Sequence, residues 1–144
     1  MNRRAAIAMS PGEVLEFLES ERVVTVATIG RDGWPHLMPL WFVVRDGECW
    51  GWTYGKSQKV RNLERDPRAT LLVEHWDPAD WSKLWWVRVF LRRGDAPEAT
   101  LAKLVAALRD RYPQYRTAPF TEILAFRIEH VGGWSAAPPS GNGS

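Results

Sequence analysis

Residues 22–54 read RVVTVATIGRDGWPHLMPLWFVVRDGECWGWTY, and this stretch decides the fold. It holds segments rich in β-branched and aromatic residues, separated by the turn sequences GRDG and RDGE. Turns this short join antiparallel neighbours, because parallel strands need a long crossover connection. The stretch therefore predicts a three-stranded meander and argues against a parallel doubly wound sheet. The expected strands are residues 22–28, 34–44 and 49–54.

The middle strand of this meander carries two prolines, Pro35 and Pro39. Proline has no backbone N–H to donate to a strand ladder, so it is found at sheet edges and irregularities. We therefore expect the first half of this strand to be irregular or to lie near an edge.

Outward from the meander, the sequence predicts three more strands and three helices. Ser10 and Glu13 form a capping box that begins the first helix, and Asp66-Pro67 ends a basic helix that begins near Ser57. The third helix is expected over residues 97–112, where apolar residues recur at helical spacing. The further strands are residues 69–76, 84–94 and 122–131. Six short strands with inserted helices indicate a mainly β (α+β) antiparallel barrel with helical plugs.

The composition indicates a single soluble domain. The chain has 144 residues with 19 basic and 17 acidic side chains, so it lacks the strong positive field of a typical nucleic-acid binder. No apolar run approaches the ~20 residues of a membrane span, and no signal-peptide core is present. Cys49 is the only cysteine, which excludes a disulfide framework and a multi-thiolate zinc site and fits a cytoplasmic setting. We expect one domain over residues 1–136 and a disordered tail over 137–144.

Nine tryptophans are unusual in a chain of this length. An indole brings a large apolar area and one N–H donor, which suits cores, interfaces and flat aromatic ligands. A small domain cannot bury all nine completely. We therefore expect some of them to face a partner subunit or a planar ligand.

The segment WTYGKSQKVRNLERDP, residues 52–67, is the candidate anion site. Ser57 is a favoured N-cap residue, and the free N–H groups of a first helical turn attract phosphate or carboxylate. Lys56, Lys59 and Arg61 add full positive charges. The alternative is a surface amphipathic helix that turns Val60 and Leu63 inward and leaves its basic residues solvated.

Sequence signatures of other enzyme classes are absent. The chain has no GxGxxG, GxxxxGK[ST], GxSxG or HExxH motif. His36, Tyr54 and His75 are candidate proton donors, but none has an obvious partner in the sequence, so we assign no catalytic residue. We predict no metal site, and His36 and His75 could share a haem or metal pocket only if folding brought them together.

Several spaced motifs resemble one known family. They are Gly33-x-Pro35 with a second proline at Pro39, Ser57-x-Lys59-x-Arg61-Asn62-Leu63, and Asp66-Pro67-Arg68. In this order they resemble the split β-barrel flavin and deazaflavin superfamily that includes pyridoxamine 5'-phosphate oxidase. The segment DWSKLWWVR (residues 80–88) and Gly133-Trp134-Ser135 are similar to its actinobacterial branch of probable coenzyme F420-dependent enzymes. The resemblance covers about residues 12–136.

This resemblance implies a six-stranded antiparallel split β-barrel that forms a homodimer with cofactor sites at the subunit interface. It implies phosphate or tail ligands at Ser57, Lys59 and Arg61, with Asn62 assisting and Thr53 near the phosphate. One side of the ring system would be lined by Met38, Pro39, Leu40 and Trp41. The partner subunit would contribute Trp76, Trp85 and Arg88.

The resemblance also implies the function. Coenzyme F420 carries a phosphodiester and a glutamate tail, which the basic residues suit, whereas flavin mononucleotide (FMN) would need fewer cations. The expected activity is hydride transfer between the deazaflavin and a planar conjugated small molecule such as a quinone, enone or tetrapyrrole. The alternatives are an FMN-dependent oxidase or reductase and a non-catalytic F420- or haem-binding protein. The chain lacks the richer set of arginines that would make it resemble a true pyridoxamine phosphate oxidase. This absence argues against a vitamin B6 substrate.

Overall fold

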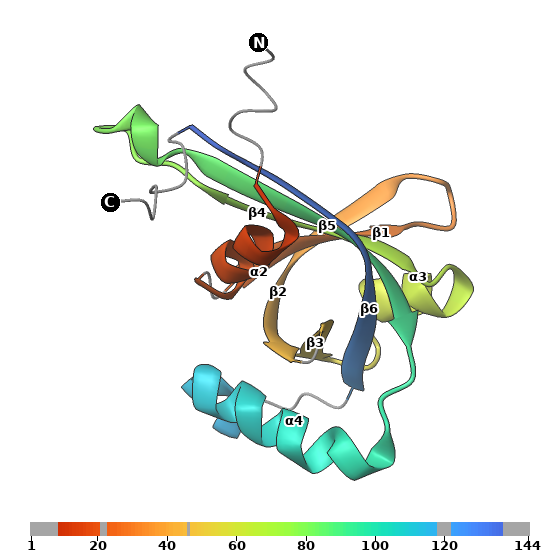
Figure 1. Cartoon of the computed structure of the whole chain (residues 1–144). Coiled ribbons are helices and arrows are strands. Elements are labelled where there is room, and N and C mark those ends of the chain that lie inside the picture. Colours follow the sequence, from red (N-terminus) through yellow and green to blue (C-terminus); the bar gives the residue numbers. More distant parts are fainter. Residues whose placement is uncertain (1–8, 21–22, 46, 118–121, 137–144) are drawn as a thin grey trace.

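Six antiparallel strands close into a barrel in the order β1-β2-β3-β6-β5-β4 (Figure 1). The computed structural model describes residues 9–20, 23–45, 47–117 and 122–136. Pairing of β1 with β4 closes the ring, and hairpins join β1 to β2 and β2 to β3. The predicted antiparallel barrel is confirmed. The strands are β1 (Val23–Ile29), β2 (Pro35–Arg45), β3 (Glu48–Thr53), β4 (Arg68–His75), β5 (Trp85–Gly94) and β6 (Glu122–Ser135).

The three described α-helices are α2 (Pro11–Ser20), α3 (Gln58–Arg65) and α4 (Glu98–Arg111), with 3₁₀ turns η1 (Trp81–Lys83) and η2 (Pro113–Arg116). The predicted capping box begins α2: the Glu13 N–H donates to Ser10 Oγ at 3.2 Å, and the Ser10 N–H donates to Glu13 Oε1 at 3.1 Å. Two N–H groups that the helix itself cannot satisfy are thereby bonded. Among the described helices, none is long and apolar enough to cross a membrane.

Two helices, α2 and α3, pack into the barrel core; the expected plug is confirmed for α3, whereas the helix before the last strand, α4, which was expected to be the other plug, does not enter this core. Val14 and Leu18 of α2, together with Val60 and Leu63 of α3, belong to the same buried cluster as the inward side chains of the strands. The third helix, α4, instead covers the outer wall of β2, β3 and the start of β6 (Figure 1). It buries a second cluster there. The members of that cluster are Val43, Trp50, Leu104, Leu108, Tyr112, Tyr115 and Ala125.

The first half of β2 lies at an edge, as its prolines predict. Residues 35–41 pair with β1 alone, and the ladder with β3 begins only at Phe42. Pro39 faces Thr25 in this register. The missing N–H groups of the prolines therefore cost no ladder bond to β3.

The last strand is longer than the sequence indicates. We expected it to end at residue 131, before Gly132 and Gly133, but β6 continues to Ser135. Gly132 and Gly133 pair with Arg88 and Val87, because the long strand β5 offers backbone partners along this whole length. In contrast, β4 ends at His75, one residue earlier than expected. The predicted tail, 137–144, lies outside the described residues.

Candidate functional site

The candidate site is the start of α3, at one end of the barrel. Thr53 is the buried last residue of β3, and the next residues form a turn in which the Ser57 N–H donates to Tyr54 O at 3.0 Å. The helix begins at Gln58, directly after this turn. Figure 1 shows α3 beside the β1–β2 hairpin. The fold thus places the free N–H groups of α3 where β3 leaves the barrel.

The Lys59 side chain is largely buried, and its ammonium group has no counter-ion among the described residues. Only 8% of its surface is exposed, and no described residue forms a hydrogen bond or an ion pair with its ammonium group. Burial lowers the pKa of Lys59, because the charged form loses hydration. A partly desolvated cation without a counter-ion is costly, so a positive group held here favours an anionic ligand. The alternative, in which the basic residues of this helix are simply solvated, does not hold for Lys59, because most of its surface is buried.

Ser57 adds a second unsatisfied group. It occupies the N-cap position of α3 with extended backbone angles, φ −68° and ψ 156°, as the sequence predicts. Its hydroxyl, however, makes no capping bond, and Ser57 Oγ is buried without a hydrogen-bond partner. Buried polar atoms are almost always paired. A hydroxyl and an ammonium group without partners, two residues apart at a helix N-terminus, together suit a phosphate.

Asn62 holds the helix in place and is already engaged. It is fully buried, its Nδ2 donates to Thr28 Oγ1 of β1 at 3.1 Å, and its Oδ1 accepts from Gln58 Nε2 at 2.8 Å. Arg65 also donates to the carbonyl of Ile29 at the end of β1. The structure therefore shows Asn62 holding α3 against β1, behind the candidate anion site. Thr28 and Gln58 were missed at the sequence level, because neither forms a motif with Asn62 along the chain.

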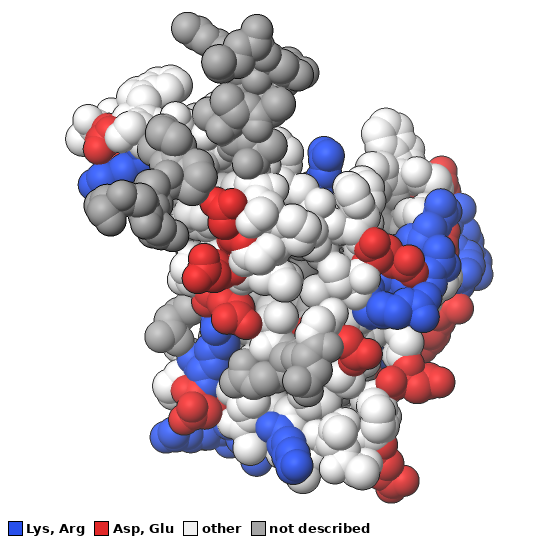
Figure 2. All heavy atoms as spheres, viewed as in Figure 1, with Lys and Arg blue, Asp and Glu red and all other residues white. Residues whose placement is uncertain are grey.

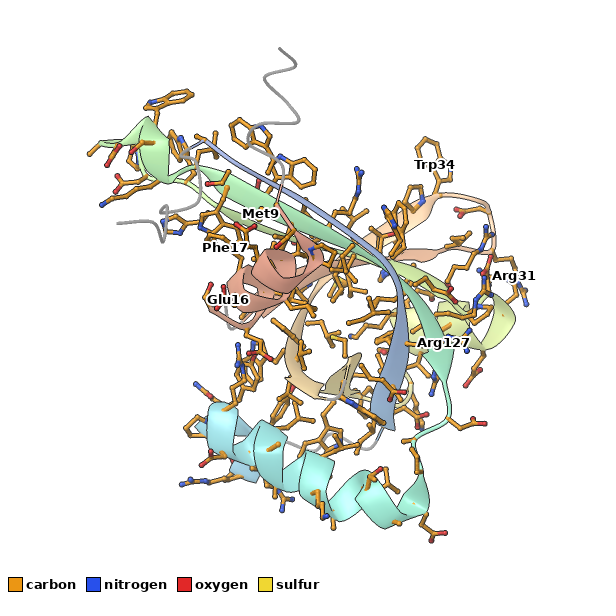
Figure 3. All side chains as sticks on the ribbon, viewed as in Figure 1. Met9, Glu16, Phe17, Arg31, Trp34 and Arg127 are labelled. Atoms are coloured by element: carbon orange, nitrogen blue, oxygen red, sulfur yellow. The ribbon has the colours of Figure 1, made fainter. Side chains whose placement is uncertain are left out.

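A cavity of about 440 Å³ lies between α3 and the β1–β2 hairpin. Figure 3 shows Arg31 beside α3, and Trp34 pointing away from the barrel at the hairpin. In Figure 2, Lys and Arg gather on this side of the molecule, interspersed with carboxylates. His36 belongs to the wall, and its Nδ1 is buried without a partner. The lining residues are Gly30, Arg31, Asp32, Trp34, Pro35, His36, Gln58 and Asn62.

The four residues expected to line a ring system separate into two groups. Met38 and Pro39 are exposed. Leu40 instead packs in the barrel core, so only its backbone is available to a ligand. Trp41 is half-buried and stacks on Tyr112, with centroids 5.4 Å apart and planes 8° apart. It thus stabilises the contact between β2 and α4.

The three residues expected from a partner subunit also differ in placement. Trp76 and Arg88 are exposed, and the Arg88 guanidinium lies 5.5 Å from the ring centroids of both Trp86 and Phe90. Trp85, in contrast, is buried within its own chain. Its ring packs on Phe17 of α2 at 4.6 Å and on His75 at 5.8 Å. Trp85 therefore cannot reach another subunit, and it anchors β5 to α2.

An exposed apolar surface covers the outer side of β1, β4, β5 and the start of β2. Leu37, Ala27, Thr70 and Phe90 follow one another across these strands, and Leu72 lies in the next row beside Arg88. Val23, Leu37, Leu72 and Phe90 are all exposed hydrophobic side chains. We call this surface the open face. Contiguous apolar patches of this kind mark interaction sites.

The histidines do not assemble into a haem or metal pocket. His36 pairs with Thr28 at the α3 end of the barrel, and His75 pairs with Trp85 at the opposite end of β4. His130 stacks on Phe90, on the open side of β5. Within the described ranges, no three His, Cys, Asp or Glu side chains come together as a metal site requires.

Comparison with known families gives one match that spans nearly the whole chain. The family model described as pyridoxamine 5'-phosphate oxidase matches residues 10–135. These residues include the barrel, α2, α3 and the candidate site. No curated protein matches the chain in sequence.

Solved structures with the same fold include proteins with different ligands. A conserved hypothetical protein from Mycobacterium tuberculosis is 34% identical, with 92% of this chain and 89% of that chain covered and a TM-score of 0.75. An F420 reductase is 25% identical, with coverages of 81% and 94% and a TM-score of 0.59. A heme-binding protein from Mycobacterium smegmatis is 20% identical, with coverages of 83% and 51% and a TM-score of 0.71, and this likeness extends to the fold alone.

Proposed function

The chain belongs to the pyridoxamine 5'-phosphate oxidase family, and on that premise we propose that it is a coenzyme F420-dependent oxidoreductase. Its substrate would be a planar conjugated small molecule of the quinone, enone or tetrapyrrole type. The observation that carries the proposal is the largely buried Lys59 side chain, whose ammonium group has no counter-ion among the described residues, two residues after the buried and unpartnered Ser57 hydroxyl at the start of α3. In the ligand-free chain these two groups can therefore already donate hydrogen bonds to a phosphate.

The basic residues around α3 suit the rest of this cofactor. Lys56 and Arg61 are exposed, and neither is paired with a carboxylate among the described residues. They would bind the carboxylates of the glutamate tail, while Ser57, Lys59 and the first N–H groups of α3 would bind the phosphodiester. Thr53 ends β3 directly before this loop and would lie beside the phosphate. F420 would contact all of these positive groups. FMN lacks the glutamate tail and would therefore not contact the exposed Lys56 and Arg61.

The chemistry would come from the cofactor, which supplies a hydride when it is bound in reduced form. The protein residues would orient the ring system and exclude water from it. Met38 and Pro39 are the exposed residues of β2 that would contact the ring. His36, in the wall of the cavity beside α3, and Tyr54, in the turn before α3, remain candidates for a proton donor.

We propose that the active form is a homodimer joined through the open face. Val23, Leu37, Leu72 and Phe90 would be buried by the same surface of a second copy, which is the arrangement of a two-fold symmetric interface. Each chain would then contribute its Arg88 to the shared interface. We further infer a cytoplasmic location from the single, buried cysteine.

Two other functions remain alternatives on the same fold. FMN carries a phosphate that fits the Ser57 and Lys59 groups equally well, so an FMN-dependent oxidase or reductase is the second candidate. A protein that binds F420 or haem without catalysis is the third. The separation of the histidines disfavours a haem held by two of them and leaves a single histidine as its ligand.

Titration of the purified apo-protein would separate these functions. Coenzyme F420, FMN and haem would be added separately, and quenching of the nine tryptophans would report binding. We expect F420 to bind at micromolar concentration and to bind more tightly than the other two. Binding of FMN or haem in the absence of F420 binding would overturn the proposal.

Substitution of Lys59 tests the proposed phosphate site directly. Loss of a charged hydrogen bond in Lys59→Ala should weaken F420 by about 1.5–3 kcal/mol. Lys103→Ala, an exposed lysine of α4, is the matched control and should leave the affinity unchanged. Equal F420 affinity of Lys59→Ala and the unmodified protein would remove Lys59 from the site.

A further inference from the structure

Another cavity, of about 410 Å³, lies between the outer wall of β3 and α4, and we call it the α4 cavity. Figure 1 shows α4 beneath β3, whereas α3 lies on another side of the barrel. The α4 cavity shares no lining residue with the cavity beside α3, and no residue of the α3 start lines it. It is therefore separate from the candidate anion site. Its wall includes Glu48, Trp50, Thr100, Lys103, Leu104 and Ala107.

Trp50 brings an unused hydrogen-bond donor to this wall. Strand alternation places Trp50 of β3 in the cluster that α4 buries, whereas its neighbour Cys49 belongs to the barrel core. Only 5% of the Trp50 surface is exposed, and its indole Nε1 is buried without a hydrogen-bond partner. Buried indole N–H groups usually have an acceptor. Of the residues that line the α4 cavity, only Trp50 has such an unpartnered buried atom.

The rest of the wall is poorly suited to hold water beside this N–H group. Leu104 and Ala107 present apolar side chains to the cavity. The hydroxyl of Thr100 already donates to the Pro97 carbonyl at 2.8 Å. A buried water molecule is held by about two to four polar partners, and this wall offers few. A mainly apolar molecule with one acceptor atom would instead pack on the apolar side chains and bond the indole.

The charges of the wall favour an uncharged ligand. Glu48 and Lys103 both line the α4 cavity and carry opposite charges, so neither sign of ligand charge is preferred. Lys103 is also exposed, and its ammonium group therefore keeps its hydration. This balance differs from the α3 start, where residues 54–61 carry three cations and no carboxylate. The volume of the cavity falls within the range of about 300–1,000 Å³ that is typical of sites for small molecules.

We propose that the α4 cavity binds a small, uncharged aromatic molecule whose carbonyl oxygen or ring nitrogen accepts a hydrogen bond from Trp50 Nε1. The ring of this molecule packs against Leu104 and Ala107, where one or two fused rings find apolar contacts. The site is a second ligand site of the chain, on a different side of the barrel from the anion site. It does not depend on which cofactor binds at α3.

NMR titration with matched probes tests this site. Quinoline and isoquinoline are uncharged at neutral pH and carry a ring nitrogen as acceptor, whereas naphthalene has the same shape without one. The nine indole N–H signals of the nitrogen-labelled protein would be followed, and Trp50→Phe, which keeps an aromatic ring, identifies the Trp50 signal by its loss. We expect quinoline or isoquinoline to move the Trp50 signal downfield to saturation. Naphthalene should bind about tenfold more weakly and cause no downfield shift, because it cannot accept the bond.

The titration of the unmodified protein also contains the results that would overturn the proposal. A Trp50 signal that responds to neither quinoline nor isoquinoline shows that the cavity does not take such a ligand. Naphthalene that binds as tightly as both probes shows that the indole bond does not select the ligand. Either result leaves the F420 titration untouched, so the cofactor is still decided independently.

Two alanines of α4 supply a matched pair of variants. Ala107 lines the cavity and is half-buried, whereas the adjacent Ala106 is exposed and does not line it. Ala107→Trp should fill the cavity and abolish the Trp50 response, and Ala106→Trp should retain it. Where Ala107→Trp does not give the spectrum of a folded protein, Ala107→Leu replaces it as a smaller filling. An unchanged response in the folded Ala107 variant would contradict binding in the α4 cavity.

A variant of the anion site tests the separation of the two sites. Lys59→Ala should bind quinoline or isoquinoline as tightly as the unmodified protein does, because Lys59 does not line the α4 cavity. Loss of the Trp50 response in Lys59→Ala would place the probe at the α3 start and overturn the second site.

Discussion

The side chain of Asn62 in α3 donates a hydrogen bond of 3.1 Å to the hydroxyl of Thr28 in β1, 34 residues earlier in the chain. Both residues are buried. Because Asn62 also accepts a bond from Gln58, this contact fixes the first two turns of α3 against the barrel wall. The position of Lys59, between Gln58 and Asn62, therefore depends on Thr28.

Removal of either partner should lower the stability of the protein. Thr28→Val keeps the shape but leaves the Asn62 amide without an acceptor, at a cost of about 1–3 kcal/mol, and Asn62→Ala should cost at least as much. Urea denaturation measures both. A double-mutant cycle should give a coupling of about 1 kcal/mol, and strictly additive effects would contradict the proposed link.

Replacement of Lys59 by methionine should stabilise the cofactor-free protein. Methionine keeps the length of the side chain and removes a partly desolvated charge that no described residue compensates, so we expect a gain of about 1 kcal/mol at neutral pH. Thermal or urea denaturation measures this difference. A loss of stability would indicate that the ammonium group is compensated in the unliganded protein. The same variant should bind F420 less tightly than the unmodified protein.

The difference in stability between Lys59→Met and the unmodified protein should depend on pH. Burial lowers the folded-state pKa of Lys59, so between that pKa and 10.5 the unfolded chain binds more protons than the folded one. The destabilising contribution of Lys59 is therefore fully present below its folded-state pKa, and it disappears as the pH rises towards 10.5. Denaturation of both proteins at several alkaline pH values should show the stabilities converging. A constant difference would contradict this assignment.

Tyr112 should be important for the attachment of α4. Its hydroxyl accepts from the Phe42 N–H at 3.2 Å and donates to the Phe42 carbonyl at 2.9 Å, just beyond the last pair of the β1–β2 ladder, Val23 with Trp41. The Tyr112 hydroxyl thus makes the two backbone hydrogen bonds with Phe42 that a neighbouring strand would otherwise make. Tyr112→Phe leaves both backbone groups without this partner and should cost about 1–3 kcal/mol in urea denaturation. Tyr54→Phe, which alters an exposed hydroxyl, should be neutral for stability.

Cys49 should react with thiol reagents only after unfolding. It is fully buried in the barrel core, and burial raises its pKa to about 12, so the nucleophilic thiolate is absent at neutral pH. The rate of labelling should therefore rise with urea in step with the population of unfolded protein. Ala106→Cys should be labelled at once. Rapid labelling of Cys49 in native buffer would contradict its position in the core.

Local patterns in the sequence were sufficient to predict the strands and helices of the fold. The two turn sequences, the β-branched residues of β1 and the capping box at Ser10 each act within a few residues, and each prediction was confirmed. The prolines of β2 correctly indicated an edge. The end of β6 was missed, because Gly132 and Gly133 are paired by β5, more than forty residues away.

The candidate site was only partly accessible from the sequence. The basic segment before and within α3 was visible as a motif, but its charges alone did not distinguish a ligand site from a solvated surface. The burial of Lys59 made that distinction. Likewise, nothing local separates Trp85, which packs on α2, from Trp76 and Trp81, which remain exposed in the connection between β4 and β5.

The sequence by itself determined the strands, the helices and the family, because turn chemistry, periodicity and spaced motifs are properties of neighbouring residues. Tertiary structure alone decided which of these residues lose their water and which partners they keep. It buried most of the Lys59 side chain with no counter-ion among the described residues, left Ser57 Oγ buried without a hydrogen-bond partner, engaged Asn62 with Thr28, and left one face of the barrel open. Burial and hydrogen bonding depend on contacts between distant segments, and no local pattern encodes them.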